Sequence, residues 1–305
     1  MSRQQKNLKE SIFEGSKSFA LASLIFNHET KLNTWRLYAW CRMSDDEIDK
    51  DPTQAKKKLD EMKKKLKQLY LGENTCKEQH WQFLQQVVDD TFIPEMYLQN
   101  MLQGFEIDAE AKLIQDERDL DFYCHAVAGV VGTMMCHIMG VSDVRALSHA
   151  DALGRAMQLT NITRDLFEDY SNNRVYLPEK WLLDFQIKRE DIFEDKNNLK
   201  LQKLVDKLFL RAEAGYQNGL QGARYLKPRA ALAVIIAAYT YRQIGRKIKR
   251  LKNPTFKNRV FITSSEKTLL VIYGFFYWLS LIPAFLANKQ IYSKQLPVLQ
   301  YKYAS

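Results

Sequence analysis

The sequence predicts an all-helical protein with one main folded domain. Of its 305 residues, 46% are hydrophobic and 27% are charged, which is the composition of a folded chain rather than a disordered one. Alternating β-branched runs bounded by turns, the pattern typical of strands, are absent. The chain has only 12 Gly and 7 Pro, with no low-complexity tract and no linker-like stretch at which to divide it.

Helical periodicity recurs along the chain. In a lysine-rich segment, Leu59, Met62, Leu66 and Leu69 lie on one side of the expected helix, and residues 51–53 before it form a start signal. Five further stretches show the same apolar periodicity and are expected to be helical: residues 80–105, 121–140, 144–170, 200–226 and 229–251.

Two short acidic clusters, residues 45–49 and 161–169, provide the strongest functional signal. Each contains two aspartates four residues apart, Asp45 with Asp49 and Asp165 with Asp169. On a helix this spacing places both carboxylates on one face, where they repel each other unless a cation lies between them. One such pair is usually a solvated surface. Here both pairs follow apolar segments, and this favours a functional site.

Arginines close to both clusters indicate a site for magnesium and a diphosphate. Mg²⁺ takes one or two carboxylates, keeps several waters and binds substrate phosphates. Arg42 precedes the first cluster, and Arg164 and Arg174 lie in and after the second. Guanidinium groups pair with phosphate oxygens in a way that a purely structural acidic surface does not need.

The remaining motifs exclude several classes of protein. The four cysteines have no paired spacing and no secretory signal opens the chain, so reduced thiols in a cytoplasmic protein are expected. Cys124-His125 and Cys136-His137 match no common zinc pattern and are interpreted as buried core. No dinucleotide-binding or Walker-type motif is present, and no motif supports binding to nucleic acid. Protein partners stay open.

Charge and hydrophobicity are unevenly distributed near the C-terminus. Residues 223–305 contain 15 Lys and Arg and one acidic residue, Glu266, so the rest of the chain is net negative. Within this basic part, residues 268–287 are uncharged and rich in aromatic side chains. Basic flanks on such a stretch are typical of helices that bind a membrane surface. Surface docking, a membrane span and a last core helix stay open for this segment.

Four segments together resemble the squalene/phytoene synthases, which join two prenyl diphosphates head to head. They are SKSF at residues 16–19, YAWCR followed by DDxxD at 38–49, YCHAVAGVVG at 123–132, and QLTNIxRD followed by ED and RVYLP at 158–178. The similarity covers residues 11–265 and is greatest to the bacterial phytoene synthases. Gly15 replaces a His of some relatives, and Phe167 replaces a usual Gly.

The resemblance implies an isoprenoid-synthase fold, a single-domain all-α helical bundle around a central cavity. Residues 1–267 would form this domain, followed by the apolar C-terminal segment 268–305. Two or three Mg²⁺ ions per site are implied, with Mn²⁺ as a substitute and no NADPH. The protein is expected in the cytoplasm, attached peripherally to a membrane through its C-terminal segment. The implied metal ligands are Asp45, Asp49, Asn161, Asp165 and Asp169.

The same resemblance assigns the other site residues. Catalytic roles are expected for the four paired aspartates and for two tyrosines that stabilise cations, Tyr123 and Tyr241. Because reactive carbocations are captured by water, the cavity must be dry and apolar. The implied substrate-binding residues are Ser16, Ser18, Phe19, Tyr38, Arg42, Val127, Gln158, Asn161, Arg164, Arg174 and Arg259.

The implied activity is the condensation of two geranylgeranyl diphosphates, through prephytoene diphosphate, to phytoene in carotenoid biosynthesis. Three alternatives stay open. A relative that uses farnesyl diphosphate makes squalene or dehydrosqualene. A head-to-tail prenyl synthase or terpene cyclase shares the DDxxD pattern of residues 45–49, but its usual second motif is missing. A non-catalytic, membrane-bound assembly factor of the same fold would be expected to lose aspartates that this chain keeps.

Overall fold

The computed structural model describes residues 3–73, 77–141, 143–251, 256 and 258–287. Within these residues the chain forms helices and no strand, so the predicted all-α class is confirmed. The α-helices are α1 (Arg3–Gly15), α2 (Lys17–Ser23), α3 (His28–Asp49), α4 (Ala55–Tyr70), α5 (Gln79–Thr91), α6 (Glu95–Ala109), α7 (Glu117–Cys124), α8 (Val130–Ile138), α9 (Arg145–Ser171), α10 (Glu179–Asp184), α11 (Asn198–Gln221), α12 (Pro228–Lys249), α13 (Ser264–Ser280) and α14 (Ile282–Ala287).

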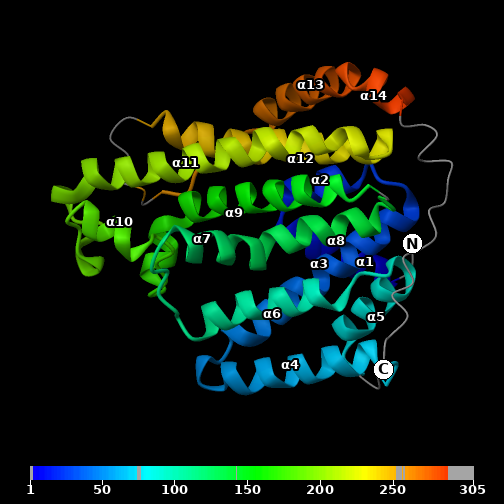
Figure 1. The fold of residues 1–305 in the computed structure, drawn as a ribbon, viewed down its shortest axis with the longest axis horizontal. Helices are drawn as coiled ribbons and strands as arrows, with labels where there is room; N and C mark the ends of the chain where they lie inside the picture. The colour runs from blue at the N-terminus through cyan, green and yellow to red at the C-terminus, as the bar shows by residue number, and fades with distance from the viewer. Residues whose placement is uncertain (1–2, 74–76, 142, 252–255, 257, 288–305) are drawn as a thin grey trace.

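Helix α9, with 27 residues, lies in the middle of the bundle (Figure 1). Helices α11 and α12 pack on one side of it, and α7 and α8 on the other. Gly154 permits the close approach of α9 to the residues that join α7 and α8, because a Cβ there would lie 2.2 Å from the carbonyl oxygen of Ala128. One hydrophobic core joins α9 to α11 and α12, and a second lies among α3, α4, α5, α6 and α8. The centre of α9 is therefore fixed from several directions.

The predicted helices are present, with breaks that periodicity did not show. Residues 80–105 form two helices, because α5 ends at Phe92 in the left-handed conformation (φ 52°) and Pro94 precedes α6. Residues 121–140 form α7 and α8, joined by a π-helical turn at His125–Gly129. The segment before α4 forms a short 3₁₀ turn, Pro52–Gln54, before the helix begins.

The apolar C-terminal segment forms α13 and α14 along the outer side of α12 (Figure 1). Trp278 Nε1 donates to the carbonyl oxygen of Pro228 at 2.7 Å, and the Tyr277 hydroxyl donates to that of Leu220 at 3.3 Å. In the described part of the chain, no helix is long and apolar enough to cross a membrane. The division of the chain at residue 267 stays a prediction.

Candidate active site

The first acidic cluster lies at the C-terminal end of α3. Arg42 lies one turn earlier, with Nη2 3.0 Å from the Asp46 carboxylate and Nη1 3.9 Å from that of Asp45. The side chain of Asp49 is outside the described part of the structure. Arg42 therefore lies close to this cluster, as predicted, and Asp46 is the nearer of its two carboxylate partners.

In the second cluster, Asp165 of α9 is held by two arginines. Arg164 donates from Nε at 2.8 Å and from Nη2 at 2.5 Å, one bond to each carboxylate oxygen. Arg259 approaches from the segment between α12 and α13, with Nε 2.9 Å from Oδ1. A guanidinium that matches two carboxylate oxygens also matches two phosphate oxygens. Two predicted diphosphate-binding residues thus meet at one predicted metal ligand.

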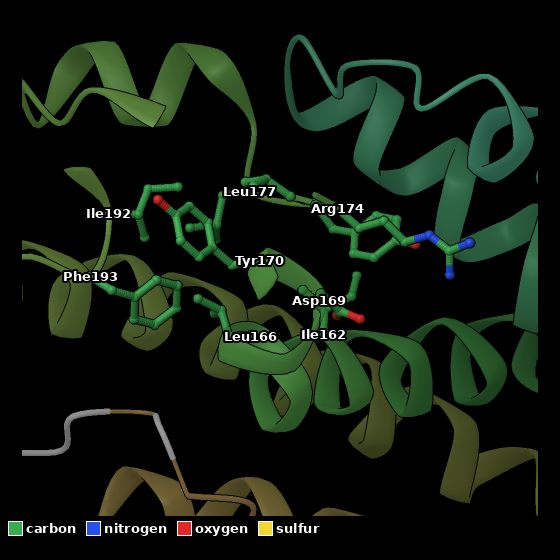
Figure 2. Close-up of a pocket in the computed structure, with 10 residues that line it drawn as sticks. Ile162, Leu166, Asp169, Tyr170, Arg174, Leu177, Ile192 and Phe193 are labelled. Carbon is green, nitrogen blue, oxygen red and sulfur yellow. The ribbon is translucent and has the colours of Figure 1, made fainter. Parts of the chain in front are cut away.

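Asp169 lies one turn further along α9, and nearby positive charge only partly offsets the burial of its carboxyl group. Burial raises the pKa of its carboxyl group to about 7, and repulsion from Asp165 adds to this effect, while Arg174 opposes it. Figure 2 shows Asp169 and Arg174 pointing to the same side, away from Tyr170 and Phe193. A carboxylate in this state would be stabilised by a cation.

Asn161 adds a third oxygen to this face of α9. Asn161, Asp165 and Asp169 follow one another at intervals of four residues, so they share one side of the helix. The amide nitrogen of Asn161 donates to Gln158 Oε1 at 3.2 Å, whereas its Oδ1 is buried and accepts no hydrogen bond from the residues that the structure describes. Buried acceptors are rarely left unsatisfied, and an amide oxygen beside carboxylates suits a hard cation. These residues therefore fit Mg²⁺.

The ligand set comes together only in part within the described residues. Among them, no group of three His, Cys, Asp or Glu side chains is close enough to hold an ion. The carboxylate of Asp165 is engaged by its arginines, and the side chain of Asp49 lies outside the description. The predicted roles of these residues in binding metal stay predictions.

A second group of predicted residues meets at the junction of α1 and α2. The Ser16 hydroxyl caps α2 by accepting from the Phe19 backbone N–H, and it lies 3.3 Å from the Tyr241 hydroxyl of α12. The rings of Phe19 and Tyr241 are 5.1 Å apart. The side chain of Ser18 is outside the described part. The fold thus joins the N-terminal motif to a residue 225 positions away.

Tyr241 lies between this N-terminal group and the acidic clusters. It interacts electrostatically with Tyr38 of α3 and with Arg164 of α9. Burial raises the pKa of Tyr38 to about 12, partly offset by the nearby Arg42 guanidinium. Residues of the first, second and fourth sequence motifs therefore face one region of the bundle.

The third motif supplies Tyr123 and Val127, at the end of α7 and in the π-helical turn. Tyr123 stacks on Tyr176, with ring centroids 4.7 Å apart and planes inclined by 17°. Val127 lies against α6, where a Cβ on Gly104 would come within 2.6 Å of its Cγ1. Turns of this kind inside α-helices are frequent at functional sites.

Two residues of this region, Asp108 and Tyr176, were not predicted. Asp108 is close enough to Asp45 and Asp169 to interact electrostatically with both, so it lies near both acidic clusters. It has no aspartate or glutamate at i+4 and no adjacent arginine, so no local pattern indicated it. Tyr176 belongs to the RVYLP motif, which could have indicated it. Phe167, the bulky departure from the family pattern, packs edge-on against Phe193 at 5.0 Å.

Gly15 gives the Tyr38 ring its position. A Cβ at residue 15 would lie 1.8 Å from the Tyr38 hydroxyl oxygen and 2.9 Å from its Cζ, so any side chain there must displace the ring. We expect Gly15→Ala to lower kcat by about 10-fold and the free energy of unfolding by about 1–3 kcal/mol. Turnover and urea unfolding measure these effects. In the control Gly245→Ala the new Cβ makes ordinary contacts, 3.6 Å at the nearest. Equal activity of the two variants would contradict this role of Tyr38.

The buried acids predict that stability depends on pH in the metal-free protein. The pKa of Asp169, about 7, and that of Asp108, about 6, exceed the value near 4 of an unfolded chain. The folded state therefore binds more protons than the unfolded state between about pH 4 and 7. Across this range we expect these two carboxyl groups to lower the free energy of unfolding as pH rises, whereas His80 and His137, whose pKa values are lowered by burial, contribute with the opposite sign.

Urea unfolding in chelator from pH 5 to 8 measures this slope. Asp169→Asn should remove the part of the slope by which stability falls as pH rises at this position, because the amide does not titrate. Asp184→Asn, at an exposed position of α10, should leave it unchanged. An equal slope in the wild type and in Asp169→Asn would contradict the buried state of the Asp169 carboxyl group.

Comparisons with known proteins identify the family. The squalene/phytoene synthase model matches residues 13–266. The chain is 35% identical to the 15-cis-phytoene synthase of Pantoea ananas, over 86% of this chain and 88% of that protein. Identity to the phytoene synthase of Rhodobacter capsulatus is 31%, over 86% of this chain and 78% of that protein.

Solved structures agree with these matches. A crystal structure of a dehydrosqualene synthase with bound ligand has a TM-score of 0.78 and 28% identity, and the match covers 90% of this chain and 96% of that one. A squalene synthase from Alicyclobacillus acidocaldarius, 22% identical, shares the fold with a TM-score of 0.72 over 80% of this chain and 92% of that one. The resemblance drawn from the four motifs is thereby confirmed, and the chain belongs to the squalene/phytoene synthase family.

Proposed function

We propose that the protein is a magnesium-dependent prenyltransferase that condenses two geranylgeranyl diphosphates head to head, through prephytoene diphosphate, to phytoene. The proposal rests on the pairing of Arg164 and Arg259 with Asp165, one turn from the unpartnered oxygen of Asn161. Donors for a diphosphate and oxygen ligands for a cation lie together there. Relatives 31% and 35% identical over most of the chain are phytoene synthases, which favours the same product.

The residues of the site divide the work by chemistry. When bound, Mg²⁺ supplies neutralisation of the charge that develops on the leaving diphosphate. The arginines bind diphosphate oxygens. Arg164 and Arg259 release the Asp165 carboxylate when they pair with the diphosphate. Ring faces stabilise cationic intermediates, and the apolar surroundings exclude water. In this assignment the ligands are Asp45, Asp49, Asn161, Asp165 and Asp169, the diphosphate-binding arginines are Arg42, Arg164, Arg174 and Arg259, and the steering rings are Tyr123 and Tyr241.

The product formed by the purified protein tests the proposal. Incubated with geranylgeranyl diphosphate and Mg²⁺, without NADPH, it should yield a forty-carbon hydrocarbon with the mass of phytoene. Chelator should abolish the reaction, and added Mg²⁺ or Mn²⁺ should restore it. With farnesyl diphosphate offered as well, a main product that is squalene and forms only with NADPH would contradict the assignment.

The strongest competing function is dehydrosqualene synthesis from farnesyl diphosphate. It is favoured by the similarity to the dehydrosqualene synthase structure, which covers 90% of this chain at 28% identity. The two functions are separated by the same assay, run with farnesyl and geranylgeranyl diphosphate in competition. A thirty-carbon product without NADPH would replace phytoene by dehydrosqualene. No product with either substrate would favour the non-catalytic assembly factor.

We further propose a cytoplasmic enzyme that docks on a membrane surface through α13 and α14. Their inner sides pack on the bundle, where a Cβ at Gly274 would lie 3.3 Å from Ile235 Cγ2. Their outer sides leave large apolar side chains between 39% and 67% exposed: Leu269, Ile272, Tyr273, Phe275, Phe276, Ile282 and Leu286. An apolar face of this kind inserts into the headgroup boundary, near which a forty-carbon product dissolves.

Apolar area, rather than charge, supports this docking. The basic side chains that precede α13 are mostly engaged within the protein. Arg242 and Arg246 pair with Glu213, Lys247 pairs with Glu266, and Lys249 pairs with Asp206. These charges contribute less attraction to anionic lipids than their number suggests.

Flotation with liposomes tests the docking surface. We expect the double substitution Phe276→Ser and Leu286→Ser to lower liposome binding by about 10-fold, because both side chains lose their apolar insertion. The matched control is Leu199→Ser and Leu210→Ser, which alters two side chains of α11 that are 78% and 67% exposed. If both double variants float like the wild type, α13 and α14 are not the docking surface.

A further inference from the structure

We propose that Asp108 is a positioning residue that fixes the rings of Tyr123 and Tyr176 in the wall of the active site. The inference rests on the proposed function and adds a residue to its site. Asp108 lies in the last turn of α6, whereas its two partners come from α7 and from the segment that follows α9.

Each carboxylate oxygen of Asp108 accepts a hydrogen bond from a different tyrosine hydroxyl. Tyr176 donates to Oδ1 at 2.7 Å, and Tyr123 donates to Oδ2 at 3.2 Å. The two rings are stacked, with centroids 4.7 Å apart and an inclination of 17°. One carboxylate therefore fixes both the spacing and the tilt of two aromatic rings that arise 53 residues apart in sequence.

The ring pair belongs to the diphosphate and metal region. Tyr176 lines the same small pocket as Asp169 and Arg174. Asp108 itself interacts electrostatically with Asp45 of α3, with Arg174, and with Asp169 of α9. Asp108 therefore lies near charged residues of both acidic clusters.

Keeping an acid in this place is costly, which argues for a role beyond packing. Burial raises the pKa of Asp108 to about 6, an effect partly offset by the Tyr176 hydrogen bond and by Arg174. Burial of an acidic group costs free energy that an apolar side chain would not cost. The benefit we assign is ring orientation, because a cation is attracted to the face of an aromatic ring and not to its edge.

Asp108→Asn tests the inference, because the amide keeps the shape but has only one accepting oxygen for two phenol donors. We expect kcat to fall by about 10- to 100-fold, as for a site displaced by about 1 Å, while KM changes by less than about 3-fold. The matched control is Glu106→Gln, on the same helix, whose carboxylate pairs with Lys63 and Lys112. Its turnover should equal that of the wild type.

A double-mutant comparison shows whether Asp108 acts through the tyrosines. The variant with both Tyr123→Phe and Tyr176→Phe already lacks the two hydroxyls, so adding Asp108→Asn should cost less than about 3-fold further in kcat. Full additivity of the losses would overturn the positioning role. If Asp108→Asn does not fold, the variant with both Tyr123→Phe and Tyr176→Phe is the test of the inference. Turnover equal to that of the wild type in this variant would also overturn it.

A readout without turnover separates this inference from the proposed function. In protein carrying ¹³Cζ-tyrosine, Asp108→Asn should shift the resonances of Tyr123 and Tyr176, assigned through the single Tyr→Phe variants. Unchanged resonances would overturn the inference whatever the activity. If instead the wild type converts neither geranylgeranyl nor farnesyl diphosphate, the proposed function fails, while the resonance shifts still decide whether Asp108 holds the two rings.

Discussion

Asp45→Asn, Asp165→Asn and Asp169→Asn are each expected to lower kcat/KM by more than about 1,000-fold, because each removes charge stabilisation worth several kcal/mol in the transition state. Asp49→Asn should behave alike, since it shares a helix face with Asp45. Asp46→Asn should cost far less, because Asp46 is turned by about 100° around the helix and pairs with Arg42 at 3.0 Å. Initial rates at several Mg²⁺ concentrations measure these effects.

Circular dichroism and urea unfolding provide the control, because loss of the fold would also abolish turnover. Asp169→Asn should be at least as stable as the wild type in chelator above pH 7, since burial of its charge is unfavourable there. Equal losses in Asp46→Asn and Asp49→Asn, with helicity intact, would favour coordination of the head-to-tail type. They would contradict the assignment of one i,i+4 pair to each cluster.

Arg164→Met is expected to give the second largest effect, a fall of about 100- to 1,000-fold in kcat/KM, as for loss of one preorganised donor to a developing negative charge. Arg164 and Asp165 are only 15% and 16% exposed, so their pairing is well shielded from water. The free energy of unfolding should fall by only about 1–3 kcal/mol, because Arg259 still pairs with Asp165 at 2.9 Å. Arg164→Lys should be intermediate, since lysine keeps the charge but not the planar fork.

The control for Arg164 is Arg155→Met on the same helix. Arg155 pairs with Asp151 at 2.9 Å and is 36% exposed. It belongs to no predicted part of the site, so turnover should stay within about 2-fold of the wild type, as for a surface ion pair. If Arg155→Met and Arg164→Met lose the same activity, general damage to α9 explains both. The diphosphate role of Arg164 would then be wrong.

The amino-acid sequence alone was enough to predict the helical class and the pairing of aspartates within each cluster. Both depend on local geometry, because 3.6 residues per turn place Asp165 and Asp169 on one face of α9 whatever surrounds that helix. It also determined the family, through four ordered motifs that the comparisons confirm. Breaks inside helices were less predictable. The left-handed end of α5 at Phe92 and the π-helical turn at His125–Gly129 give no change of periodicity.

Which distant residues meet was visible only once the helices were seen packed together. Ser16 reaches Tyr241 because α2 packs on α12, and Arg259 reaches Asp165 because α12 and α9 pack side by side in the bundle. The packing of α6 in the bundle likewise brings Asp108 near both acidic clusters, although nothing in its own neighbourhood along the chain marks it. Such contacts depend on how helix faces pack against one another, and helical periodicity fixes each face without fixing its partner.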